Sequence, residues 1–190
     1  MNNTMKYSFF FAVLLFVMEL FVLFRLPLAS DTFLQKTTEW TLEGIVNRLK
    51  TSPLNQEVAD DPNGFLHTYL PVFEQLKKYD ISHLPMSEKR IIAHLFNNLG
   101  TANIRLMQYE QAISYLELAV GIEPQNAFAH RNLGYALKEV GKVNKNRVYL
   151  LKAIEEYKKV IALEKKDSDL YKRVSRVIYK IQNVYLPSIE

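Results

Sequence analysis

Cysteine is absent from the 190-residue sequence, and glycine and proline are scarce, with six and seven residues. Without cysteine the chain can form no structural disulfide, no thiolate nucleophile and no cysteine-ligated zinc or iron–sulfur site. So few glycines also leave little room for a nucleotide-binding turn. The shortage of helix breakers, beside abundant leucine, isoleucine, valine, lysine and glutamate, favours an all-α fold.

Motifs for catalysis and metal binding are also lacking. The histidines are His67, His83, His94 and His130. None forms an i,i+4 pair or a His-Glu-x-x-His sequence, and no nucleophile elbow or paired catalytic carboxylate stands out. The stretch Asp60-Asp61-Pro62 is interpreted as a solvated turn, because no further ligand spacing accompanies it. We therefore expect no enzyme activity, no metal and no cofactor.

What the sequence does contain is an internal period of thirty-four residues, over which Asn98-Leu99-Gly100 recurs as Asn132-Leu133-Gly134. The first unit is Ala93–Asn126. Its key positions hold Phe96, Leu99, Gly100, Tyr109, Ala112, Ala119 and Pro124. This period and pattern resemble the tetratricopeptide repeat. One site departs from the family pattern, because Asn103 stands where an aromatic residue is usual.

The residue types in this pattern have mechanical reasons. Gly100 and Ala112 are small, so two antiparallel helices can approach closely, and Ala119 leaves room for the next repeat. Pro124 lacks an N–H group and therefore ends the second helix. The resemblance implies helical hairpins stacked into a short solenoid over residues 93–185, with flanking helices. His130 falls at an aromatic packing position of the second unit, where we expect a core role.

The second unit, residues 127–167, departs from the period after Gly141. The small-apolar pair of its second helix occurs as Ala153-Ile154, seven residues late. Seven residues are about two helical turns, so the buried face stays almost in phase. One apolar stripe then contains Val143, Leu150, Ile154, Tyr157 and Ile161. We expect longer helices here, with a longer loop as the alternative. Residues 168–185 are expected to form the closing helix.

A long apolar run lies near the start of the sequence. Tyr7–Phe24 contains eighteen residues and one charge, Glu19. At 1.5 Å per residue the run spans about 27 Å, roughly the thickness of the hydrocarbon core. We expect residues 1–30 to be an uncleaved signal anchor with one transmembrane helix, rather than a cleaved signal peptide, whose apolar core is usually shorter. The helical domain is then expected on the periplasmic or exoplasmic side, although the flanking charges are nearly balanced.

Glu19 is unusual within such a run, because a carboxylate inside a membrane span costs free energy. One interpretation is a hydrogen bond to a polar group on a partner membrane helix. The alternative is a carboxylate that reaches the interface or stays protonated.

Residues 31–92 are expected to form a helical linker and capping region. The expected segments are a helix over 31–50, a connector over 51–64, a helix over 65–79 and a turn over 80–86. Pro71 is expected to start or kink its helix. That helix is expected to cover the open end of the first repeat, as solenoids require. Ser87 is expected to cap the helix that leads into the repeat.

The resemblance also implies where a partner binds. In this family the first helix of each repeat lines a concave groove. The matching positions here are His94, Asn97, Thr101, Ile104, Arg105, Phe128, Arg131, Tyr135, Lys138 and Glu139, with Asp169, Lys172 and Arg176 on the closing helix. Some members hold a chaperone-tail carboxylate with lysine and asparagine at set positions. Asn97 alone does not complete that pattern, so this function is not expected.

Charge is unevenly distributed along the chain. From Ala127 onward there are fourteen Lys/Arg and seven Asp/Glu, against ten and thirteen before it. This favours an acidic peptide, anionic lipid or nucleic acid as a partner, with a solvated surface as the alternative. Nucleic acid is disfavoured, since aromatic residues are not clearly interleaved with the basic ones.

These observations together predict a membrane-anchored adaptor, or a structural or assembly subunit of a membrane protein complex, that acts by protein binding. The alternative is a periplasmic chaperone-like accessory factor that binds secreted or unfolded polypeptides.

Overall fold

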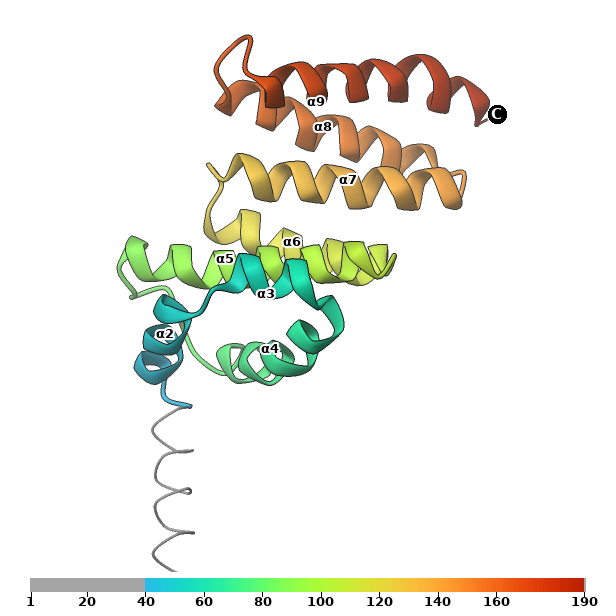
Figure 1. The fold of residues 1–190 in the computed structure, drawn as a ribbon. Helices are drawn as coiled ribbons and strands as arrows, with labels where there is room; N and C mark the ends of the chain where they lie inside the picture. Colours follow the sequence, from blue (N-terminus) through green and yellow to red (C-terminus); the bar gives the residue numbers. More distant parts are fainter. Residues whose placement is uncertain (1–39, 190) are drawn as a thin grey trace, which may run out of the picture. The chain divides into compact units, whose positions relative to one another are not determined.

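The computed structural model describes residues 40–189, and within that range it has eight α-helices and no strand (Figure 1). The helices are α2 (Leu42–Thr51), α3 (Leu54–Asp60), α4 (Pro62–Leu76), α5 (Met86–Arg105), α6 (Tyr109–Ile122), α7 (Ala127–Val143), α8 (Arg147–Leu163) and α9 (Asp169–Lys180). The chain then continues through a π-helical turn at Ile181–Tyr185 and a 3₁₀ turn at Leu186–Ser188. The all-α prediction is confirmed for these residues.

The apolar run that the sequence predicts as a transmembrane helix, with Glu19 inside it, lies outside the described residues. Between residues 40 and 189, none of the helices combines the length and the apolar character needed to cross a bilayer. The chain divides into two units between Gly44 and Ile45, and the second unit contains the helical repeats.

The first repeat forms the antiparallel hairpin α5–α6. Gly100 is buried in α5, and a Cβ placed on it would lie 2.4 Å from Cγ of Leu116 in α6. This is the close approach that the small residue predicts. Asn103, the departure from the family pattern, is also buried, and its Nδ2 donates to the carbonyl oxygen of Leu99 at 2.8 Å. The hairpin therefore buries this polar residue with a hydrogen-bond partner for its side-chain amide.

The second repeat forms the hairpin α7–α8 and divides the seven added residues between its two helices. α7 and α8 have seventeen residues each, whereas α6 has fourteen and α5 has thirteen from Ala93 onward. The two three-residue turns are alike, since their middle residues Met107 and Lys145 have φ angles of 59° and 48°. The structure therefore has longer helices joined by a turn of unchanged length, and the longer loop considered from the sequence is absent from this hairpin.

A second glycine contact keeps the lengthened helices close together. Gly134 faces Tyr157, and a Cβ placed on it would lie 3.0 Å from Cε1 of the ring, which repeats the Gly100 contact of the first hairpin. Gly141, two helical turns further on, faces Leu150, and a Cβ there would lie 2.8 Å from Cδ2. The added residues thus bring their own small residue to the contact.

The predicted apolar stripe of this hairpin is correct only in part. Leu150, Ile154 and Tyr157 are buried, but Ile161 is half-buried and Val143 is 73% exposed. Val143 is the last residue of α7, next to the turn into α8. Its place in the stripe was therefore wrong.

The segment before the repeats differs from the sequence prediction. The expected connector contains helix α3, and α4 begins at Pro62, with Asp61 accepting a hydrogen bond from the Gly64 N–H at 3.0 Å. Pro62 fits the first helical position because its missing N–H would have no partner there. Asp61 is therefore a helix cap, and Pro71 lies inside α4 rather than at its start.

Helix α4 covers the first repeat as expected. The ring of Phe73 meets Phe96 of α5 and Tyr115 of α6 edge-on, with centroid distances of 5.4 and 5.0 Å. The predicted cap at Ser87 is wrong, because α5 already begins at Met86, after Pro85, which makes no side-chain capping bond.

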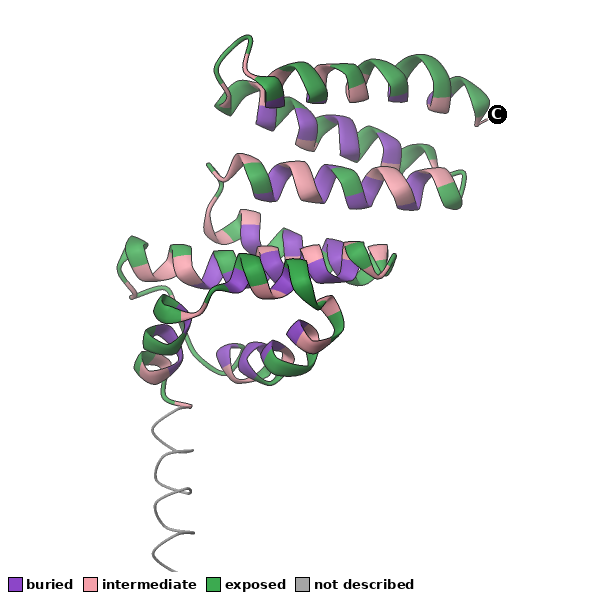
Figure 2. Cartoon of the chain, in the orientation of Figure 1, coloured by how far each residue is buried: buried purple, intermediate pink, exposed green. Residues whose placement is uncertain are grey.

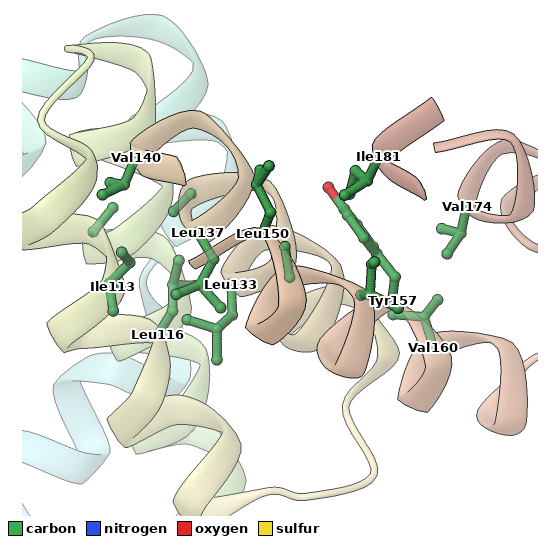
Figure 3. Close-up of a cluster of buried hydrophobic side chains, with 14 of the residues drawn as sticks. Ile113, Leu116, Leu133, Leu137, Val140, Leu150, Tyr157, Val160, Val174 and Ile181 are labelled. Carbon is green, nitrogen blue, oxygen red and sulfur yellow. The ribbon is translucent and has the colours of Figure 1, made fainter. Parts of the chain in front are cut away.

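Buried side chains from α6, α7, α8 and α9 form one continuous core (Figures 2 and 3). Figure 3 shows Leu133 and Leu137 of α7 beside Leu116 of α6, with Leu150 of α8 on their other side. On the far side of α8, Val174 and Ile181 complete the cluster. The closing helix therefore protects the apolar face that the second repeat would otherwise expose.

Candidate functional site

Two neighbouring hollows lie along the surface formed by α3, α5, α7 and α9. We call this surface the concave groove. The first hollow, of about 540 Å³, is lined by Asn55, Val58, Ala59, His94, Asn97, Asn98, Thr101, Arg105, Asn126, Phe128, Arg131 and Asn132. The second, of about 320 Å³, is lined by Thr101, Ile104, Arg131, Asn132, Tyr135, Tyr157, Leu170, Arg173, Val174 and Val177. The structure therefore brings together most of the predicted groove residues.

Three side chains line both hollows and separate them: Thr101, Arg131 and Asn132. Asn132 is fixed by hydrogen bonds, because its Nδ2 donates to Oδ1 of Asn97 at 3.0 Å and to Oγ1 of Thr101 at 3.3 Å. Its Oδ1 accepts from the Nη2 of Arg131 at 3.0 Å. The asparagine of the repeated Asn-Leu-Gly sequence thus orients the guanidinium of Arg131.

Arg131 is partly buried and forms no ion pair within the described part of the chain. Burial lowers the pKa of its guanidinium, and the positive charge of Arg173 lowers this pKa further. The guanidinium also lies 5.5 Å from the ring centroid of Phe128, which is largely exposed. The groove therefore presents a desolvated cation that an incoming carboxylate would stabilise.

The second hollow is mostly apolar below its two arginines. Leu170, Val174 and Val177 of α9 face Ile104 of α5 across it. Tyr157 lies at its base, and burial, followed by the negative charge of Glu139, raises the pKa of its hydroxyl. An apolar side chain next to a carboxylate fits this lining.

Tyr135 and Lys138 lie further along α7, and Lys138 is engaged within the protein. Its Nζ lies 4.4 Å from the Tyr135 ring centroid and 2.8 Å from Oε1 of Glu139. Burial would raise the pKa of Glu139, but hydrogen bonds from Lys138 and Lys142 outweigh burial and lower it. Lys138, predicted as a groove residue, lines neither hollow.

The protein's own helix α3 covers part of the groove along α5. Nη1 of Arg105 donates to the carbonyl oxygen of Ala59 at 3.1 Å, and Nδ2 of Asn98 donates to Oδ1 of Asn55 at 3.0 Å. Arg105 is therefore already partnered by the chain itself. His94, at the edge of the same hollow, lies 3.9 Å from a carboxylate oxygen of Glu123.

On the closing helix, the residue at the groove differs from those predicted. Lys172 and Arg176 are exposed and line neither hollow, whereas Arg173 lines the second one. The prediction placed α9 one residue out of phase with the groove. The apolar residues Leu170 and Val174 indicate the face of α9 that lines the groove. Arg173 lies on this face because it follows Leu170 by three positions. The role of all these residues in partner binding stays a prediction.

His130 belongs to the core. It is buried, with Nδ1 2.6 Å from Oε2 of Glu156 and Nε2 2.9 Å from the carbonyl oxygen of Pro124. Both ring nitrogens are thus occupied by hydrogen bonds. Across residues 40–189, no group of three or more histidine, aspartate or glutamate side chains could hold a metal ion.

Comparison with known proteins gives a match to a family model. Residues 93–126 match the family model described as the tetratricopeptide repeat. No curated protein matches the chain significantly. Among solved structures, the crystal structure of MamA matches with 20% identity over 82% of this chain and 90% of that chain, and a TM-score of 0.37. A score this low does not establish a shared arrangement of helices. The family model coincides with most of the α5–α6 hairpin, so the match identifies this hairpin as one tetratricopeptide repeat.

Proposed function

We propose that the chain is an adaptor or assembly subunit of a membrane protein complex and binds a segment of a partner protein in the concave groove. Tetratricopeptide-repeat proteins are generally non-enzymatic scaffolds that bind other proteins, and the hairpin α5–α6 carries the match to that family. The family match bears on protein binding in general, whereas the membrane complex and the contact through the groove are parts of the proposal that need their own tests.

The observation that carries the groove contact is Arg131. This guanidinium is partly buried and has no carboxylate partner among residues 40–189, so it has lost hydration and gained no ion pair there in return. A partner carboxylate at this position would form charge-assisted hydrogen bonds, each worth about 1.5–3 kcal/mol when well aligned. Asn132 holds the guanidinium in place before binding, so little side-chain entropy remains to be lost.

The hollow beside Arg131 indicates which kind of residue would lie next to the carboxylate. Its volume of about 320 Å³ and its lining of leucine, valine and tyrosine fit an aliphatic or aromatic side chain. The bound segment in this proposal is therefore acidic, with a large apolar residue adjacent to the acid. The exposed ring of Phe128 adds a stacking surface at the other hollow.

The test is co-purification from native membranes in mild detergent. We compare three proteins. They are the wild-type chain, a groove variant that carries both Arg131→Glu and Tyr135→Ala, and a control, Lys158→Glu, which reverses a charge on the exposed side of α8. We expect one stoichiometric partner, retained by Lys158→Glu and lost from the groove variant. A partner retained by all three proteins would contradict binding through the groove. Many substoichiometric polypeptides would instead favour the chaperone-like accessory factor.

The membrane part of the proposal rests on the sequence of residues 7–24, and it is tested separately. Alkaline extraction of membranes should leave the chain in the pellet, and removal of residues 1–30 should release it. Protease added to the periplasmic or exoplasmic side should cleave the helical domain. Release of the intact chain by alkali would contradict a transmembrane anchor.

A further inference from the structure

The turn between α7 and α8 has an unusual surface. We call residues 142–148 the hairpin tip. Val143 is 73% exposed and Val148 is 59% exposed, on either side of the turn. Neither side chain is covered by the core. Both residues flank the turn that ends the lengthened hairpin, and Figure 1 shows this turn between α7 and α8.

The charges at the hairpin tip have one sign. Lys145 and Arg147 are exposed, and within residues 40–189 neither forms an ion pair. No aspartate or glutamate occurs between Glu139 and Glu155 in the sequence. Lys142 is paired with Glu139 at 2.8 Å, so Lys145 and Arg147 are the cations of the tip that have no ion-pair partner within residues 40–189.

The C-terminal segment extends this surface. The Tyr185 ring lies 5.3 Å from Nζ of Lys142 and 5.6 Å from Nζ of Lys180, which places the end of α9 next to the hairpin tip. Val184, adjacent to Tyr185, is 50% exposed. The segment after α9 therefore lies beside the hairpin tip and carries an exposed valine next to the contact.

The corresponding turn of the first repeat does not share these charges. Its three residues are Leu106-Met107-Gln108, and the backbone has the same shape. The nearest cation, Arg105, donates to the carbonyl oxygen of Ala59 instead of facing solvent alone. The charges are therefore a property of the lengthened hairpin and not of the repeat in general.

We infer that the hairpin tip is a contact site for an anionic phospholipid surface. Flexible lysine and arginine side chains attract anionic headgroups while valines enter the boundary between headgroups and acyl chains. An acidic protein is the other chemistry that matches the charge. The bilayer is favoured because a projecting turn with two isolated valines needs no complementary pocket, whereas protein partners bury larger, shaped surfaces.

The test uses the full chain and its lack of cysteine. A single cysteine at Val143→Cys carries an environment-sensitive fluorophore, and Leu118→Cys, at an exposed leucine of α6, is the matched control. Each protein is mixed with vesicles of phosphatidylcholine alone, or of phosphatidylcholine with phosphatidylserine, that contain a quencher on the acyl chain. Circular dichroism confirms that both variants stay folded, as exposed positions should allow.

We expect quenching at position 143 on the phosphatidylserine vesicles, weaker quenching on phosphatidylcholine, and little at position 118. Each cation near an anionic surface strengthens contact about fivefold. Adding Lys145→Gln and Arg147→Gln to the labelled protein should therefore lower, by about 25-fold, the ratio of protein with a quenched label to protein with an unquenched label. No quenching at position 143 on either vesicle, or equal quenching at positions 143 and 118, would overturn the inference. The first of these results would leave an acidic protein as the occupant.

Discussion

The contact between Gly100 and Leu116 gives a sharp test of the first hairpin. An alanine in place of a helical glycine normally stabilises a helix by about 1 kcal/mol. At position 100 the new methyl group would lie 2.4 Å from Cγ and 2.8 Å from Cδ2 of Leu116, which is completely buried. Overpacking of this kind costs about 1–3 kcal/mol or more, so we expect Gly100→Ala to lower the free energy of unfolding by about 1–2 kcal/mol.

Gly121 provides the matched control within the same hairpin. It lies in the last turn of α6, and nothing lies within 4 Å of the position that its Cβ would occupy. Gly121→Ala should therefore gain about 0.5–1 kcal/mol, because only the helix propensity changes.

The assay is thermal unfolding followed by circular dichroism, with urea unfolding as a check on the free energies. The two alanine variants should differ in Tm by about 3–12 °C, given 2–4 °C per kcal/mol for a chain of this size. If Gly100→Ala unfolded at or above the temperature of Gly121→Ala, the close packing of α5 on α6 would be refuted.

Three further predictions concern polar contacts. The pKa of Glu139 is lowered in the folded state, so this group stabilises the fold above its unfolded pKa and loses that effect as the pH falls through the folded value. Glu139→Gln should thus lower the free energy of unfolding by about 1 kcal/mol at neutral pH and by little at acid pH, as measured by urea unfolding at both pH values. His130→Leu should cost about 2–3 kcal/mol, and a double-mutant cycle with Glu156→Gln should show coupling between the two side chains. Asn126→Ala should lower stability by about 1 kcal/mol because Asn126 caps α7, whereas exposed Gln125→Ala should have no effect on Tm.

The sequence predicted the hairpins because their signals are local and repeated. Gly100 and Gly134 recur at one period, and each faces the side chain that closes its hairpin. The seven-residue shift to Ala153 also kept the helical phase, so lengthened helices followed from elementary geometry. Pattern and packing agree at these positions.

Other features depend on contacts that no local pattern contains. The helix α3 has only seven residues between proline-rich ends, and it is held by pairing with α5 through Asn55 and Arg105. The exposure of Val143 depends on where α8 begins, and the place of Arg173 depends on how α9 packs. Periodicity gives the face of a helix, but the exact phase against a neighbour is set by tertiary packing.

The position of the added residues separates the two surfaces proposed for this chain. The period of thirty-four still holds at Gly134, so Phe128 and Arg131 of the groove come before the added residues, whereas Lys145 and Arg147 lie between the residues added to α7 and those added to α8. Lengthening the hairpin therefore moves the tip outward without moving Phe128 and Arg131 relative to the first repeat. It follows that Arg131→Glu should abolish partner co-purification and leave quenching of the tip unchanged, while neutralising the tip cations should do the reverse. A variant of either kind that removed both activities would show that the groove and the tip act as one surface.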